Sequence, residues 1–348
     1  MIKEIVVSLL VMFSLVACGG GNGSNASTSN SPPVTTAQES WQQISGATAN
    51  RIYSIALEST KKTIYTGTES GVYKTTIGSD SWVSLNTGLP SSYISTVVID
   101  PTNSQVIYAG TMYGVYKTVD GGTSWNYSAS APYDSLVEGV VESIAIDPTN
   151  SQVIYVGANG IFKSVDGGNS WNKVYTNEDI NLIFINYIAI DPTNSQIIYA
   201  GRHFGGVIKS IDGGKTWSTI NNGLPPAYIY MNYLAIDPSD SQTVFVATNG
   251  RGVFKSTNGG MSWSVTGSRL ASSFVHSLLI DPANTQTIYA GTYFEGLYKS
   301  TDGGGTWSAV DIGPTPTNIW TFAIDMTSQR TIYAGTEEGK VLKGLLID

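Results

Sequence analysis

Residues 118–125 read Thr-Val-Asp-Gly-Gly-Thr-Ser-Trp, and the chain repeats this stretch in nearly the same form. Its centre is a tight-turn sequence, because glycine adopts positive φ without strain and aspartate bonds back to nearby backbone. Further copies occupy residues 164–171, 210–217, 256–263 and 300–307. A degenerate copy at residues 75–82 has Ile77 and Ser79 in the aspartate and glycine positions. Regular copies of one hairpin indicate a repeat architecture.

Each hairpin belongs to a larger unit. An acidic residue ends an apolar run in every unit and marks the period, at Glu58, Asp100, Asp147, Asp191, Asp237, Asp281 and Asp325. Apolar runs such as residues 143–146 lack polar alternation, which is typical of strands buried on both faces. An Asp-Pro turn, an aromatic and β-branched strand (106–110), a third strand (114–118) and a fourth strand opening with tryptophan follow. Four short antiparallel strands per unit predict an all-β, seven-bladed β-propeller.

The two ends of the repeat complement each other. The seventh unit stops at Lys343 and Gly344 without a hairpin, whereas Trp41 to Ile44 reads as a fourth strand that lacks the first three. We predict that this N-terminal strand completes the last blade, so that no sheet edge stays open. The propeller is therefore expected to span residues 41–348.

The hairpin resembles the Asp-box, or bacterial neuraminidase repeat, with the pattern Ser/Thr-x-Asp-x-Gly-x-Thr-Trp. Over residues 41–348 the chain is similar to single-propeller Asp-box proteins, among them the photosystem II assembly and stability factor family, and its propeller is of the kind found in sortilin and xyloglucanases. The resemblance implies a propeller fold, and it does not by itself imply catalysis.

We interpret the hairpin residues as structural. The aspartate accepts backbone hydrogen bonds across the turn, and the tryptophan packs between sheets. This interpretation covers Asp120, Trp125, Asp166, Trp171, Asp212, Trp217, Asn258, Trp263, Asp302 and Trp307. It extends to the lysine at the same place in every third strand, at Lys74, Lys117, Lys163, Lys209, Lys255, Lys299 and Lys343.

The N-terminus has the features of a lipoprotein signal. Lys3 precedes an apolar stretch from Ile5 to Ala17, which is too short to span a bilayer and suits a signal h-region. Leu15-Val16-Ala17-Cys18 resembles the lipobox of bacterial lipoproteins. We therefore expect a signal peptide at residues 1–17, lipidation of Cys18, and a flexible Gly/Ser/Asn tether over residues 18–40. An ordinary signal peptide that contains a cysteine is the alternative. Gly19 favours the outer membrane in a host with two membranes, on the periplasmic or the surface side.

Composition and charge exclude several classes of protein. Charged residues are 13% of the chain and aromatic residues 11%, which argues against disorder. The net charge of −8 argues against a nucleic-acid partner, since such binding relies on clustered lysine and arginine. A membrane is expected to be contacted through the lipid anchor alone, and the protein is expected to be a monomer.

Candidate binding residues lie in the loops that join strands two and three and in those that lead to the next blade, because these loops carry the variation in the repeat. They are Arg202, His203, Phe204, Arg251, Tyr293, Phe294, Trp320 and Tyr113. Arg269 and His276 add to a basic side, and Glu69, Glu295, Glu337 and Glu338 to an acidic one. We expect these charges to segregate across the loop face. Solvated loops whose aromatic residues pack against one another are the alternative.

An enzymatic role is the second hypothesis. A glycoside hydrolase needs two carboxylates roughly 5 to 10 Å apart, and the candidates are Glu138 with Glu142, or Glu295 with Glu337. The chain has two histidines, one cysteine and no ligand-spaced cluster, so neither a metal site nor a cofactor is predicted. The sequence favours a non-enzymatic envelope lipoprotein that binds a protein or glycan partner through its loop face.

Overall fold

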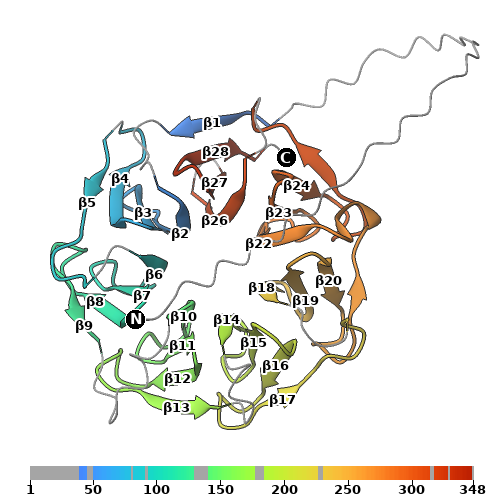
Figure 1. The fold of residues 1–348 in the computed structure, drawn as a ribbon, viewed down its shortest axis with the longest axis horizontal. Helices are drawn as coiled ribbons and strands as arrows, with labels where there is room; N and C mark the ends of the chain where they lie inside the picture. The colour runs from blue at the N-terminus through green and yellow to red at the C-terminus, as the bar shows by residue number, and fades with distance from the viewer. Residues whose placement is uncertain are drawn as a thin grey trace, which may run out of the picture. The chain divides into compact units, whose positions relative to one another are not determined.

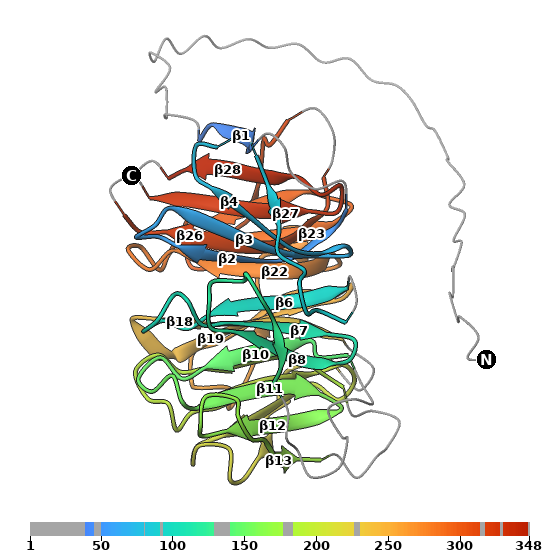
Figure 2. The ribbon, with the colours of Figure 1, turned by 90° about the vertical axis from the view of Figure 1, so that its left-hand side faces the viewer.

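The computed structural model describes residues 39–44, 50–79, 81–90, 93–128, 140–176, 184–225, 230–313, 317–327 and 330–346. Within the unit from Glu39 to Asp348, seven four-stranded antiparallel sheets surround a central axis (Figure 1). This arrangement confirms the seven-bladed β-propeller. The first strand of each blade lies innermost (Figure 1), and Figure 2 shows the ring turned by 90°.

The blades follow the order of the chain. Blade 1 contains β2 (Ile52–Glu58), β3 (Thr63–Thr68), β4 (Gly71–Thr76) and β5 (Val83–Ser84); blade 2 contains β6 (Ile94–Ile99), β7 (Ile107–Thr111), β8 (Gly114–Thr118) and β9 (Asn126–Tyr127). Blade 3 contains β10 (Ser143–Ile146), β11 (Ile154–Ala158), β12 (Gly160–Ser164) and β13 (Asn172–Tyr175); blade 4 contains β14 (Ile185–Ile190), β15 (Ile198–Arg202), β16 (Val207–Ser210) and β17 (Ser218–Thr219). Blade 5 contains β18 (Met231–Asp237), β19 (Asp240–Thr248), β20 (Gly252–Ser256) and β21 (Ser264–Val265), and a 3-10 helix, η1 (Ser268–Leu270), follows it. Blade 6 contains β22 (Phe274–Ile280), β23 (Ile288–Tyr293), β24 (Leu297–Ser300) and β25 (Ser308–Val310); blade 7 contains β26 (Ile319–Asp325), β27 (Thr331–Thr336), β28 (Val341–Leu345) and β1 (Trp41–Ile44).

Neighbouring blades pack most closely at one position of the second strand. β7 and its counterparts are buried along most of their length. A Cβ atom on Gly157 would lie 2.8 Å from the carbonyl oxygen of Ile185 in the next blade. The glycine at the position of Gly157 therefore sets the spacing between neighbouring sheets. In blade 5 this position is occupied by the buried Ala247 instead of glycine.

The hairpins that join the third and fourth strands of blades 2 to 6 are hereafter called the Asp hairpins. In the first of them, Asp120 Oδ1 accepts the backbone N–H of Ser124 at 2.9 Å and the hydroxyl of Thr118 at 2.6 Å. The indole N–H of Trp125 donates to the carbonyl of Leu85 in the preceding blade. Asn258 keeps the same contacts, accepting the backbone N–H of Ser262 at 2.9 Å. Each hairpin is thus closed by its own side chains. In four of the five the indole N–H also donates to the preceding blade, whereas that of Trp217 donates to Gly214 in its own hairpin.

We expect these hairpins to make the fold sensitive to acid. Hydroxyl and backbone donors hold the pKa of Asp120, Asp166, Asp212 and Asp302 at about 2. Because the folded pKa lies below the unfolded one, this stabilisation is complete above about pH 4 and is lost as the pH falls toward 2. Melting temperatures measured from pH 5 to pH 2 should therefore fall less steeply in a variant with asparagine at all four positions. Parallel profiles for this variant and the parent would contradict the expectation.

The repeated lysines connect adjacent blades. Lys117 Nζ and the hydroxyl of Tyr108 both donate to the carbonyl of Gly167 in the next Asp hairpin, each at 2.8 Å. The same pair of donors meets Gly213 and Gly259 further along the ring. Each lysine also lies over the ring of the tyrosine or phenylalanine beside it on the second strand, in six of the seven blades. These residues hold sheets together.

The ring closes as the sequence predicts. β1 pairs antiparallel with β28, and Trp41 lies opposite Gly344. Blade 7 has no Asp hairpin, so no glycine carbonyl is offered to Tyr289 and Lys299 of blade 6. Both donate instead to the carboxylate of Glu39, the tyrosine at 2.7 Å. The folded unit accordingly starts at Glu39, which the sequence analysis assigns to the tether.

Candidate functional site

One residue of every blade lines the mouth of the central channel. In six blades the pairing between the first and second strands shifts by one residue near the start of the first strand, which is a β-bulge. In blade 3 the same place, directly before Ser143, is taken by Glu142. These seven residues form the bulge ring: Tyr53, Ser95, Glu142, Asn186, Asn232, His276 and Trp320.

The bulge ring lines a cavity of about 860 Å³. Tyr187 and Tyr233 lie below the ring with their centroids 4.0 Å apart. Pro101, Pro148 and Pro192, from the Asp-Pro turns, line the opposite end. The volume lies within the range of small-molecule sites, and it opens on the loop face because the first strands begin there.

Aromatic rings continue from the channel mouth onto the loops of blades 6 and 7. Tyr93 contacts Tyr53 at a centroid distance of 4.9 Å, and Tyr53 contacts Trp320 at 5.8 Å. His276 stacks on Trp320 at 4.0 Å. Tyr293 then links His276 to Phe294, and Phe294 contacts Phe274. We call this series the aromatic arc: Tyr93, Tyr53, Trp320, His276, Tyr293, Phe294 and Phe274.

A second aromatic group lies on blades 4 and 5. His203 contacts Phe204, Tyr230 and Phe184, with centroids 4.7, 4.2 and 6.2 Å away. Its Nδ1 lies 3.2 Å from the side-chain oxygen of Asn186 in the bulge ring. This second aromatic group therefore borders the same channel mouth, on the side of the bulge ring that blades 4 and 5 form.

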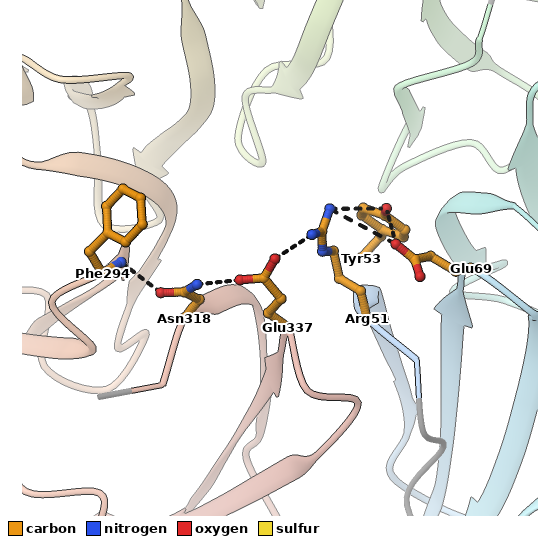
Figure 3. Close-up of polar contacts among 6 residues, drawn as sticks. All are labelled: Arg51, Tyr53, Glu69, Phe294, Asn318 and Glu337. Atoms are coloured by element: carbon orange, nitrogen blue, oxygen red, sulfur yellow. Dashed lines mark hydrogen bonds and ion pairs between the residues drawn. The ribbon is translucent and has the colours of Figure 1, made fainter. Parts of the chain in front are cut away.

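A polar relay ties together the loops of blades 6, 7 and 1 (Figure 3). The backbone N–H of Phe294 donates to Asn318 Oδ1 at 2.6 Å, and Asn318 donates in turn to Glu337. Glu337 also accepts a hydrogen bond from Arg51. The guanidinium lies over Trp320, 4.7 Å from the ring centroid, and 4.0 Å from the carboxylate of Glu69. Arg51 is absent from the sequence-based candidates, yet it is the centre of this relay.

The relay holds Phe294 in an unusual conformation. Its φ is +79°, in the left-handed region that costs a non-glycine residue about 1 to 2 kcal/mol. The side chain is 63% exposed, so burial of the ring does not compensate for this cost. Strain of this kind is kept where surrounding contacts impose it, and it is concentrated at functional sites.

Burial sets the charge of the channel mouth. It raises the pKa of Glu142 to about 7, and it lowers the pKa of His276 to about 4, with Arg51 adding to the effect. Burial also lowers the pKa of His203. Both imidazoles are therefore neutral at pH 7, and the Glu142 carboxyl is the group that changes charge there.

The other sequence-predicted residues lie around this site rather than in it. Arg202 donates to the carbonyl of Gly205 and so braces its own loop. Arg251 and Tyr113 are exposed. Glu295 accepts hydrogen bonds from Ser273 at 2.7 Å and from Tyr298 at 3.1 Å. Glu138 and Cys18 lie outside the described residues.

The predicted segregation of charge does not hold at two places. Arg51 lies between Glu69 and Glu337 on the side expected to be acidic. Arg269 donates to the Tyr298 hydroxyl that itself bonds to Glu295. Short loops from adjacent blades bring opposite charges together, which chain order does not reveal. Within the described part of the chain, no group of three or more metal-ligating side chains converges, and no helix has the length and apolar character needed to cross a membrane.

Solved structures share the fold of this chain. A GH74 xyloglucanase from Xanthomonas campestris superimposes with a TM-score of 0.68 at 17% identity, covering 87% of this chain and 53% of that one. The extracellular domain of BT4673 from B. thetaiotaomicron gives 0.69 at 21% identity, covering 87% and 40%. YCF48 from Cyanidioschyzon merolae gives 0.64 at 15% identity, covering 87% and 98%. At these identities the likeness establishes the fold alone.

The chain spans about half the length of the xyloglucanase that it matches. No protein-family model matches it. No curated protein matches it either.

Proposed function

We propose that the protein is a non-enzymatic scaffold that binds a protein or glycan partner through the loop face around the channel mouth. The observation that carries the proposal is Phe294, a strained and exposed aromatic residue held by Asn318, Glu337 and Arg51. Phe274 and Phe184 are also exposed on this face, 40% and 42% respectively. Exposed aromatic side chains anchor interfaces and stack on sugar rings.

The binding proposal is tested by offering the purified chain both kinds of partner. A glycan array and a pull-down from the cell envelope would each be run with the parent chain and with Phe294 variants. Capture that depends on Phe294 in one assay identifies the class of partner. Equal capture by parent and variants in both assays would contradict a role for this face.

Replacing Phe294 with glycine should separate stability from binding. Glycine removes the left-handed strain, so we expect the free energy of unfolding to rise by about 1 kcal/mol, while partner capture falls. Phe294→Ala is the matched control, because it removes the ring but keeps the strain, and it should lose capture without gaining stability. Denaturant unfolding and the capture assays measure the two effects. A less stable glycine variant that still binds would refute the expectation.

The raised pKa of Glu142 favours a second candidate, a glycan-active hydrolase. A buried carboxyl with a pKa of about 7 suits a general acid. Its nearest predicted partner, Glu138, lies outside the described residues, whereas Glu295 and Glu337 are occupied by hydrogen bonds. Turnover of a polysaccharide that is abolished by Glu142→Gln, Glu138→Gln or Glu295→Gln would replace the scaffold proposal.

We further propose that the Asp hairpins are Asp-box repeats and that the protein is a lipoprotein of the outer membrane. Supporting the second point are the apolar stretch from Ile5 to Ala17 and the lipobox-like residues before Cys18. The tether, which the start of the folded unit at Glu39 shortens to residues 19–38, would then hold the propeller away from the bilayer. Mass spectrometry of the native protein should find an acylated N-terminal Cys18. An unmodified Cys18, or a retained signal segment, would refute this anchor.

A further inference from the structure

The channel mouth contains one carboxyl group in otherwise uncharged surroundings. Among the described residues, its lining holds a single acidic side chain, Glu142, and neither lysine nor arginine. Within the same residues the structure gives the Glu142 carboxylate no hydrogen-bond donor, and burial alone accounts for its raised pKa. The Glu142 side chain is half-buried and lines the cavity, and a charge that has lost much of its water is stabilised by an opposite charge. A ligand that brings a positive charge would supply the missing partner.

The walls around Glu142 suit an organic cation. Tyr93 lines the same cavity as Glu142. Burial raises the pKa of its phenol, and the Glu142 carboxylate adds to this effect. The Tyr93 ring packs against Tyr53 at 4.9 Å. A cation over an aromatic face is attracted by the ring quadrupole, and recognition of substituted ammonium groups uses such faces. A metal ion fits less well, because no cluster of oxygen or nitrogen ligands converges here among the described residues.

The fixed cation beside the aromatic arc, Arg51, has other carboxylate partners than Glu142. Arg51 is paired with Glu337 and lies 4.0 Å from Glu69. It also donates to the Tyr53 hydroxyl at 3.3 Å, and its guanidinium lies 5.6 Å from the Tyr53 ring centroid.

Glu142 belongs to blade 3, between Ser95 of blade 2 and Asn186 of blade 4 in the bulge ring. Both neighbours are neutral and already have partners: the Ser95 hydroxyl donates to backbone carbonyls, and the Asn186 side-chain oxygen lies 3.2 Å from His203 Nδ1. Neither therefore competes with a cation for the carboxylate.

We propose that the channel mouth is a binding site for a small organic ammonium ion, with the cation against Glu142 and its alkyl groups against Tyr93 and Tyr53. This site is distinct from the exposed Phe294 surface and does not depend on the proposed partner. The cavity of about 860 Å³ leaves room for a ligand larger than the cationic group itself.

Binding should depend on pH through Glu142. The other titratable groups of the lining are His203, His276 and the phenols of Tyr53, Tyr93, Tyr187, Tyr230 and Tyr233. The pKa of both imidazoles is lowered by burial, and burial raises the pKa of the Tyr53, Tyr93, Tyr187 and Tyr233 phenols. Only the ionised form of Glu142 attracts a cation, so affinity should fall as the pH drops below about 7.

The test is calorimetric titration of the full chain with choline at pH 8, beside its neutral isostere 3,3-dimethyl-1-butanol. We expect choline to bind with a Kd of roughly 10 mM or tighter, at least tenfold tighter than the alcohol. Glu142→Gln should weaken choline at least tenfold and leave the alcohol unchanged. Glu338→Gln, an exposed acidic control on the same face, should leave both unchanged. At pH 6, titrations in two buffers should show release of up to one proton per choline bound.

Three results would overturn the proposal. The first is the absence of saturable choline binding. The second is equal binding of choline and the alcohol, which would indicate an apolar pocket. The third is choline binding that Glu142→Gln leaves intact, or that Glu338→Gln weakens equally, which would indicate general attraction to an acidic protein. The thermal unfolding of Glu142→Gln serves as the folding control, since a neutral amide replaces the carboxyl at the same size.

Discussion

Replacing Glu39 with alanine is expected to lower the free energy of unfolding by about 3 kcal/mol. The Glu39 carboxylate accepts both Tyr289 and Lys299, and the Glu39 side chain is only 10% exposed. Removing one partner of a buried ion pair leaves the other charged group buried and unpaired, which is the costly case. Because the contact joins the N-terminal segment to blade 6, its loss should also loosen β1. Denaturant unfolding at pH 7 measures the cost.

Glu39→Gln is the matched control for this expectation. Glutamine keeps an oxygen acceptor of similar reach for Tyr289 and Lys299, but it lacks the charge. We expect this variant to lose clearly less stability than Glu39→Ala. Hydrogen exchange should report faster opening of β1 and β28 in the alanine variant than in the parent. If alanine costs less than about 0.5 kcal/mol, the value usual for surface substitutions, then the carboxylate does not lock the ring.

The repeat made the fold predictable because each unit is consistent at several levels. The Asp-Gly-Gly turns fix hairpins, the apolar runs fix innermost strands, and the orphan strand at Trp41 fixes the closure. Glu39 was missed because its role is visible only once blade 6 is known to lack a hairpin neighbour. No local sequence pattern shows that the Glu39 carboxylate takes the place of the glycine carbonyl that the Asp hairpins offer to the tyrosine and lysine.

The bulge ring could have been found from the sequence. Each member stands five places before the acidic residue that ends its strand, from Tyr53 before Glu58 to Trp320 before Asp325. At this one position of the first strand the side-chain group differs between blades: it is a phenol, a hydroxyl, a carboxyl, an amide, an imidazole or an indole. A position that varies in chemistry within a fixed strand marks a site placed on a rigid scaffold.

Arg51 could not have been found in the same way. It precedes β2, outside the regular part of the unit, and its partner Glu337 is 286 residues away in the sequence. The two meet because the ring brings blade 7 against blade 1. The sequence also suggested that charges would segregate, since it assigns residues to blades but does not show which loops touch.

Glu142→Gln is expected to change how stability depends on pH. The pKa of Glu142 is about 7 in the folded protein, against an ordinary value near 4.5. Between these two pH values Glu142 is protonated in the folded state and ionised in the unfolded state. The stability of the parent therefore falls as the pH rises through this window. Glutamine does not titrate, so the variant lacks this loss.

The difference between variant and parent isolates this one group. Both chains keep the Asp hairpins, whose acid dependence cancels in the comparison. From pH 4 to pH 8 the unfolding free energy of Glu142→Gln, minus that of the parent, should rise by up to about 3 kcal/mol, since one pKa unit corresponds to 1.36 kcal/mol. Saturating choline should narrow the difference at pH 8, because a ligand that binds only the folded parent stabilises it. A difference that stays constant with pH would show that Glu142 has the same pKa in the folded and the unfolded state, so that the channel mouth does not bury its charge.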